Sequence, residues 1–153
     1  MKRKAEFLTV LENGPLDDTG FALLTAKLVY FSAKAGQQFE ALPGFRTNFV
    51  TGRKLLVVRR IVQDTMNPAA VIHDQLYDTG EVSRALADEV FLEAMLVLGV
   101  AGWRAYAAYA AVRAFGWKFY RAAPAIGVEK NPVRQIERQS ELEQRSGASS
   151  NAM

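Results

Sequence analysis

The sequence predicts a mixed α+β domain: an N-terminal antiparallel β-meander, then three packed helices, then a polar C-terminal tail. Residues 5–50 alternate short β-prone runs with turn signals, whereas residues 67–120 place apolar side chains at helical spacing. Hydrophobic residues make up 50% of the 153 positions, which is enough for one buried core. We therefore expect a single domain over residues 1–127 and a tail or partner-binding arm over residues 128–153.

Glycine and proline mark the ends of the predicted strands. The apolar runs cover residues 7–11, 21–24, 27–31 and 38–42, and turn signals such as Pro43-Gly44 lie between or beside them. We expect three or four strands from these runs. Residues 53–63 mix β-branched side chains with paired basic ones, and we favour a helix there.

Capping residues predict where the first two helices begin. Asn67 before Pro68 is typical of a helix start, and this first helix is expected to end near residue 77. Ser83 is expected to cap a second helix that reaches about residue 98. The connection between them is short, so the two helices should be antiparallel neighbours.

A third helix, over residues 102–120, carries aromatic side chains on nearly all sides. A helix that is apolar all round is normally buried, and a small domain has little room to bury one. Part of its surface is therefore expected to meet a partner, although packing over the β-sheet is an equal alternative. We assign the contact to five aromatic residues: Trp103, Tyr106, Tyr109, Trp117 and Tyr120.

Charge is distributed unevenly, although the net charge is only +3. Five basic and no acidic residues lie between Arg46 and Arg60, whereas seven acidic residues and one basic residue, Arg84, lie between Asp64 and Glu93. This pattern indicates either two solvated faces or docking against neighbours of opposite sign. The basic block lacks interleaved aromatic residues, so we expect no nucleic-acid binding. No apolar stretch approaches the roughly 20 residues of a membrane span, so no transmembrane segment is expected.

The single histidine, His73, lies on the first predicted helix on the same face as Leu76 and Tyr77. Asp88 lies at the margin of the apolar stripe of the second helix, so the imidazole should reach its carboxylate. Such a pair can hold a general base or a metal ion, or it can be a satisfied core contact that fixes helix packing. An ordinary surface pair of Asp88 with Arg84 is a further alternative.

Several segments, taken in order, resemble the phage and prophage family called domain of unknown function 1353. The resemblance covers roughly residues 20–117 and is carried by Leu42-Pro-Gly-Phe-Arg-Thr-Asn-Phe49, Ala69-Ala-Val-Ile-His-Asp-Gln-Leu-Tyr77, residues 83–99, Trp103-Arg104 and residues 111–116. It implies a phage- or prophage-encoded accessory protein, a tail or assembly component of the virion. The expected location is the virion or the cytoplasm of the infected bacterial host, and the expected partners are other phage structural proteins or a second copy.

The loop after the predicted meander departs from the family pattern. The family usually reads Gly-Phe-x-Thr-Asp-Phe-Ala-Ser-Val-Pro, whereas this chain has Asn48 at the acidic position, Thr51 at the serine and Arg53 at the proline. If the loop carries a metal ligand or a catalytic carboxylate in other members, that charge is lost here, although Asn48 still offers a neutral oxygen to a metal.

A second pattern is similar to the core of small secreted phospholipases A-two. It consists of His73-Asp74-x-x-Tyr77, followed by Asp88-x-x-Phe91 on the next helix. The resemblance implies that His73 is a general base, that Asp74 is a calcium ligand and that Asp88 orients the imidazole.

The chain lacks other features of those enzymes. It has no cysteine, and residues 44–52 are not glycine-rich. We therefore expect a non-enzymatic protein with a degenerate His–Asp site and no cofactor. The alternative is a calcium-dependent ester hydrolase that acts in host envelope disruption or lysis, with His73 and Asp88 catalytic and Asp74 and Asn48 binding the metal.

Overall fold

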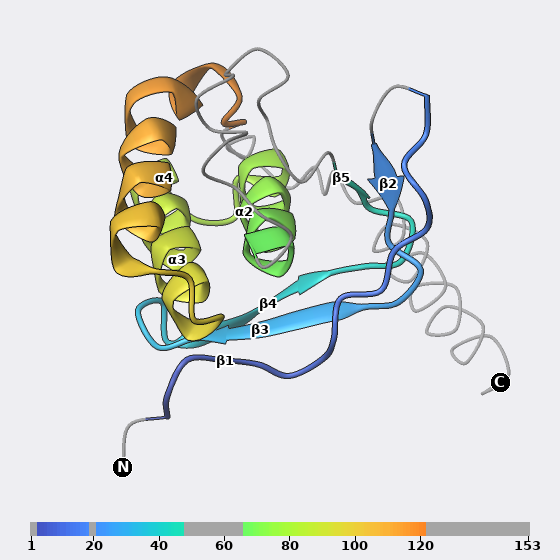
Figure 1. Cartoon of the computed structure of the whole chain (residues 1–153), viewed down its shortest axis with the longest axis horizontal. Helices are drawn as coiled ribbons and strands as arrows, with labels where there is room; N and C mark the ends of the chain where they lie inside the picture. The colour runs from blue at the N-terminus through green and yellow to red at the C-terminus, as the bar shows by residue number, and fades with distance from the viewer. Residues whose placement is uncertain (1–2, 19–20, 48–65, 122–153) are drawn as a thin grey trace, which may run out of the picture. The chain divides into compact units, whose positions relative to one another are not determined.

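The computed structural model describes residues 3–18, 21–47 and 66–121, which form antiparallel strands followed by helices (Figure 1). This confirms the predicted α+β class. The strands are β1 (Glu6–Phe7), β2 (Ala22–Leu23), β3 (Leu28–Ser32), β4 (Gln37–Ala41) and β5 (Arg46–Thr47). The helices are α2 (Asn67–Thr79), α3 (Arg84–Val97), α4 (Gly102–Phe115) and the short 3-10 helix η2 (Gly116–Lys118). The predictions for residues 53–63 and 128–153 lie outside the described residues.

The strands divide between two sheets instead of forming one continuous meander. In the larger sheet β3 lies between β1 and β4, and both pairings are antiparallel. The run at residues 21–24 becomes β2, which pairs with β5 through Ala22 and Thr47. The turn at Gly44 explains this pairing, because a positive φ of 85° returns the chain beside β2. The Gly44 amide then donates to the Leu24 carbonyl at 2.8 Å.

Helices α2 and α3 cover the larger sheet, and α4 packs on α3 (Figure 1). Alternate residues of the strands and one face of each covering helix form a single buried core. Its largest fully buried apolar side chains are Leu28, Tyr30, Phe39, Met66, Val71, Ile72, Leu76, Val90 and Met95. The buried positions of α4 are only Ala105 and Ala108, so this helix approaches α3 closely through small side chains.

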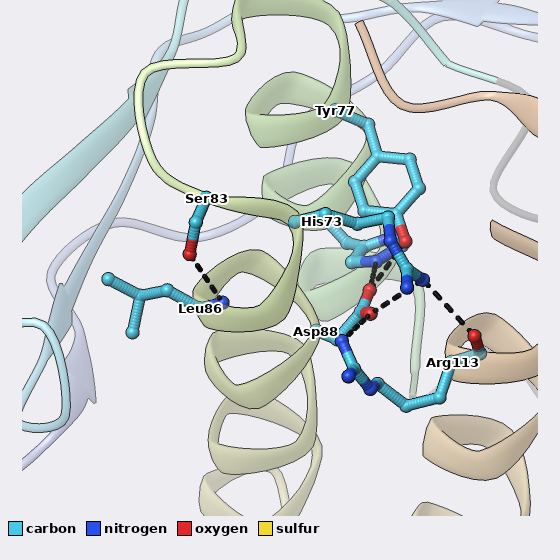
Figure 2. Close-up of polar contacts among 7 residues, drawn as sticks. His73, Tyr77, Ser83, Leu86, Asp88 and Arg113 are labelled. Carbon is cyan, nitrogen blue, oxygen red and sulfur yellow. Dashed lines mark hydrogen bonds and ion pairs between the residues drawn. The ribbon is translucent and has the colours of Figure 1, made fainter. Parts of the chain in front are cut away.

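Of three features predicted at the helix ends, the structure confirms one and differs at two. Ser83 caps α3 as predicted, because its Oγ accepts a hydrogen bond from the Leu86 amide at 3.2 Å (Figure 2). The predicted Asn67 cap is wrong: Met66 occupies the cap position of α2 without a side-chain hydrogen bond. Helix α4 also ends at Phe115, earlier than residue 120, and the chain tightens into η2 at Gly116.

Glu93 on α3 joins the helical part to the β3–β4 hairpin. Its Oε2 accepts hydrogen bonds from the Tyr30 hydroxyl at 3.0 Å and the Ser32 hydroxyl at 2.7 Å. Its Oε1 accepts from the Lys34 amide at 2.9 Å. Burial and the nearby Glu93 charge raise the pKa of Tyr30, so this hydroxyl stays protonated and donates. The hairpin is therefore fixed against α3 by three polar contacts.

We predict that Glu93→Ala lowers the free energy of unfolding by roughly 1–3 kcal/mol, because buried hydroxyl donors lose their acceptor. Glu89→Ala is the matched control, one turn earlier on the same helix, where an exposed carboxylate pairs with Lys34 at 3.3 Å. Glu89→Ala should lower the free energy of unfolding by less than about 1 kcal/mol. Chemical denaturation measures both, and equal losses would show that the Glu93 contacts are not special.

Candidate functional site

The carboxylate of Asp88 is completely buried and accepts four hydrogen bonds (Figure 2). Its Oδ1 accepts from His73 Nε2 at 3.0 Å and from the Tyr77 hydroxyl at 2.5 Å. Its Oδ2 accepts from Arg84 Nη1 at 3.5 Å and from Arg113 Nη1 at 3.2 Å. A carboxylate offers about four lone-pair sites, so all of them are used. We call these five residues the Asp88 cluster.

Three helices contribute to the Asp88 cluster. His73 and Tyr77 lie one turn apart on α2, and this spacing places both side chains on one face. Arg84 and Asp88 are related in the same way on α3, and Arg113 comes from the last turn of α4. Arg84 Nη1 also donates to the Arg113 carbonyl at 3.1 Å. The cluster therefore fastens α2, α3 and α4 to one another at one point.

The donors keep the buried carboxylate ionised. Burial by itself would raise the pKa of Asp88, but hydrogen bonds from His73 and Tyr77, the charge of His73 and the hydrogen bond from Arg113 outweigh it. The net result is a pKa below the ordinary value of 3.8. Burial and the contact with Asp88 together raise the pKa of Tyr77, so its hydroxyl remains a donor. At neutral pH the cluster contains a carboxylate anion surrounded by donors.

His73 is held tightly and is only 5% exposed. Its ring lies between Tyr77 and Phe91, with centroid distances of 4.0 and 4.7 Å. The predicted contact with Asp88 is confirmed, but Asp88 is fully buried and not at the margin of its helix face. Because the carboxylate accepts from Nε2, the neutral ring has Nδ1 as its acceptor. Nδ1 has no hydrogen-bond partner in the part of the chain that the structure describes.

Arg113 and the hydroxyl role of Tyr77 were not predicted from the sequence. The signal that points to them is the burial of Asp88, because a buried charge needs several donors. Gly116 adds a further constraint, since a Cβ at that position would overlap the Tyr77 hydroxyl. Only glycine allows the end of α4 to approach the cluster this closely.

The residues predicted to bind calcium are not seen together. Asp74 follows His73 on α2, is partly buried, and accepts a hydrogen bond from the Thr47 hydroxyl of β5 at 2.9 Å. Asn48, the other predicted ligand, lies outside the described residues. Within residues 3–18, 21–47 and 66–121, no three acidic or histidine side chains are grouped as a metal site would require. Calcium binding stays a prediction.

The five aromatic residues assigned to a partner divide into two groups. Trp103, Tyr106 and Trp117 are exposed, whereas Tyr109 and Tyr120 are half-buried. Tyr120 packs edge-on against the Tyr77 ring with centroids 5.5 Å apart, and its hydroxyl donates to the Val82 carbonyl at 2.8 Å. Tyr120 therefore packs against α2 and the connection between α2 and α3, whereas Trp103, Tyr106 and Trp117 are exposed.

Residues 22–112 match the family described as protein of unknown function, DUF1353. The chain belongs to this family. This confirms the resemblance to domain of unknown function 1353 that was drawn from the sequence. His73, Tyr77, Arg84 and Asp88 lie within the match, and Arg113 is the next residue after it. No curated protein and no solved structure shows a significant match to the chain. Among the described helices, none is both long and apolar enough to cross a bilayer.

We predict that Asp88→Asn lowers the free energy of unfolding at neutral pH by about 3–5 kcal/mol, because the paired buried charge is lost. The folded-state pKa of Asp88 is depressed, so its contribution is present above the ordinary value of 3.8 and is lost as the pH falls below it. Urea denaturation across pH should therefore show the wild-type and variant curves converging in acid. Curves that stay parallel down to strongly acidic pH would mean that Asp88 does not titrate as a stabilising anion.

Proposed function

We propose that the chain acts by binding and not by catalysis, as an accessory protein of a phage or prophage that is built into or assembled onto the virion. The observation that carries this proposal is the state of Asp88, which is buried with every lone-pair site used by donors from three helices. In this proposal the Asp88 cluster has a structural task.

A satisfied polar network of this kind rigidifies the elements that it joins. The Asp88 cluster fixes the position of α4, which contacts α3 and carries exposed aromatic side chains on its outer side. A preorganised surface loses less conformational entropy when a partner binds. Tryptophan and tyrosine are also enriched among the residues that dominate binding energy. These points support a role for α4 as the binding element.

The phage assignment is supported by the resemblance drawn from the sequence, which implies a phage or prophage origin. Residues 22–112 match DUF1353, which is described only as a protein of unknown function. The virion, or the host cytoplasm before assembly, is the corresponding location. Other phage structural proteins or a second copy stay the predicted partners, and the arm over residues 128–153 stays a predicted contact.

One observation favours a second candidate, a calcium-dependent ester hydrolase. Asp88 orients His73 through Nε2, while Nδ1 has no partner among the described residues. A general base for water has this arrangement, with one ring nitrogen held and the other available. Asp74 is the adjacent residue on α2, and in this candidate it binds calcium with Asn48 to polarise the ester. The 5% exposure of His73 weighs against access by a substrate.

The variant His73→Gln separates the two candidates, because a glutamine amide can still donate to Asp88 but cannot act as a base. We predict that the purified chain hydrolyses phospholipid or short-chain esters no faster than His73→Gln, with or without calcium. We also predict that particles from the encoding phage, or from the induced prophage, contain the chain whether it is the wild type or His73→Gln. Calcium-dependent hydrolysis that disappears in His73→Gln would establish the hydrolase. Particles that lack the wild-type chain would refute the virion assignment.

A further inference from the structure

Large apolar side chains are exposed along α4 and η2. They are Trp103, Tyr106, Phe115, Trp117 and Phe119, with exposed fractions of 72%, 58%, 51%, 63% and 49%. We call these five residues the aromatic ridge. Leu96 and Val97, at the end of α3, are also exposed. A cluster of this kind on a soluble domain indicates an interaction surface.

The spacing along α4 explains why Trp103 and Tyr106 face outward. Trp103, Tyr106, Ala110 and Ala114 recur at intervals of three and four, so they lie along one side of the helix, and all four are exposed. The buried positions Ala105 and Ala108 lie against the domain. The outward side of α4 therefore carries aromatic residues at its start and small residues further along, with no charge at these positions.

The aromatic ridge lies in a stretch of sequence that contains basic residues but no acidic ones. No acidic residue occurs between Glu93 and Glu129, whereas the same stretch contains four basic residues: Arg104, Arg113, Lys118 and Arg121. Lys118 is exposed beside Trp117, with its Nζ 5.3 Å from the ring centroid. Two of the other basic residues are paired with carboxylates: Arg113 with Asp88 at 3.2 Å and Arg121 with Asp78 at 3.0 Å.

This charge pattern disfavours a second copy as the occupant. In a two-fold contact between two such ridges, the stretch would supply no carboxylate to the exposed Lys118 of the other copy. The complementary partner must supply negative charge next to an environment that accepts tryptophan and tyrosine rings. The interface of an anionic bilayer supplies both, since aromatic rings prefer the headgroup level and anionic headgroups attract lysine and arginine.

We propose that the aromatic ridge binds an anionic lipid surface, with α4 lying along the membrane plane and Lys118 directed to the headgroup phosphates. The proposal rests on the binding role of α4 proposed above and names its ligand. It requires no catalytic activity of the Asp88 cluster. Insertion is shallow, as is typical of amphipathic helices that lie in the interface.

Intrinsic fluorescence tests this directly, because the chain has two tryptophans and both belong to the aromatic ridge. The full chain is mixed with vesicles of phosphatidylcholine and phosphatidylglycerol in equal parts, and with vesicles of phosphatidylcholine alone. We expect a shift of emission to shorter wavelength and co-sedimentation with the anionic vesicles only, both weakened by salt.

Two pairs of variants check which surface is responsible. Lys118→Glu should weaken binding to the anionic vesicles by about tenfold or more, whereas Lys4→Glu, at another exposed lysine, should have a much smaller effect. Tyr106→Ala should also weaken binding, whereas Val10→Ala, which alters an apolar residue that is 80% exposed elsewhere, should not.

Absence of binding to the anionic vesicles would overturn the proposal, as would equal binding to both vesicle types or equal effects of the ridge and control variants. If vesicle binding fails while particles still contain the chain, the aromatic ridge contacts protein and the virion assignment survives. If the chain does not bind the vesicles and the particles also lack it, the proposed function is wrong.

Discussion

The burial of the Asp88 carboxylate is the constraint on which the helical part of the structure depends. An ionised carboxylate away from water is tolerated only when donors replace the lost hydration. His73 and Tyr77 from α2, Arg84 from α3 and Arg113 from α4 provide these donors. The position of each helix is thereby tied to one anion, and Gly116 allows the end of α4 to come close enough.

Helix α3 is the central element because it carries a second carboxylate that contacts the sheet. Glu93 binds the β3–β4 hairpin through Tyr30, Ser32 and the Lys34 amide. Asp88 therefore binds α3 to α2 and α4 through hydrogen bonds, and Glu93 binds α3 to the strands in the same way. On its outer side α4 exposes Trp103 and Tyr106, and further exposed aromatic side chains follow at and beyond its end. Rigid packing on the inside and an apolar surface on the outside fit a protein that works by binding.

The sequence predicted the parts of this arrangement that depend on local spacing. Helical phase and a short link brought His73 to Asp88, and Ser83 was recognised as a cap because its hydrogen bond is local. The contacts of Arg113 and Glu93 join residues 25 and up to 63 positions apart, and no periodicity encodes them. The pairing of β2 with β5 likewise follows from the turn at Gly44 and not from strand propensity.

Amide hydrogen exchange tests most directly whether the Asp88 cluster holds α4 in place. Arg113 is the side chain through which α4 reaches Asp88, so Arg113→Ala removes that contact and leaves α2 and α3 paired. If the cluster holds α4, amide hydrogens throughout α4 should exchange faster in this variant, with little change in β3, β4 and the core of α2. Unchanged exchange in α4 would contradict it, because α4 would then be held in place without its side-chain contact to Asp88.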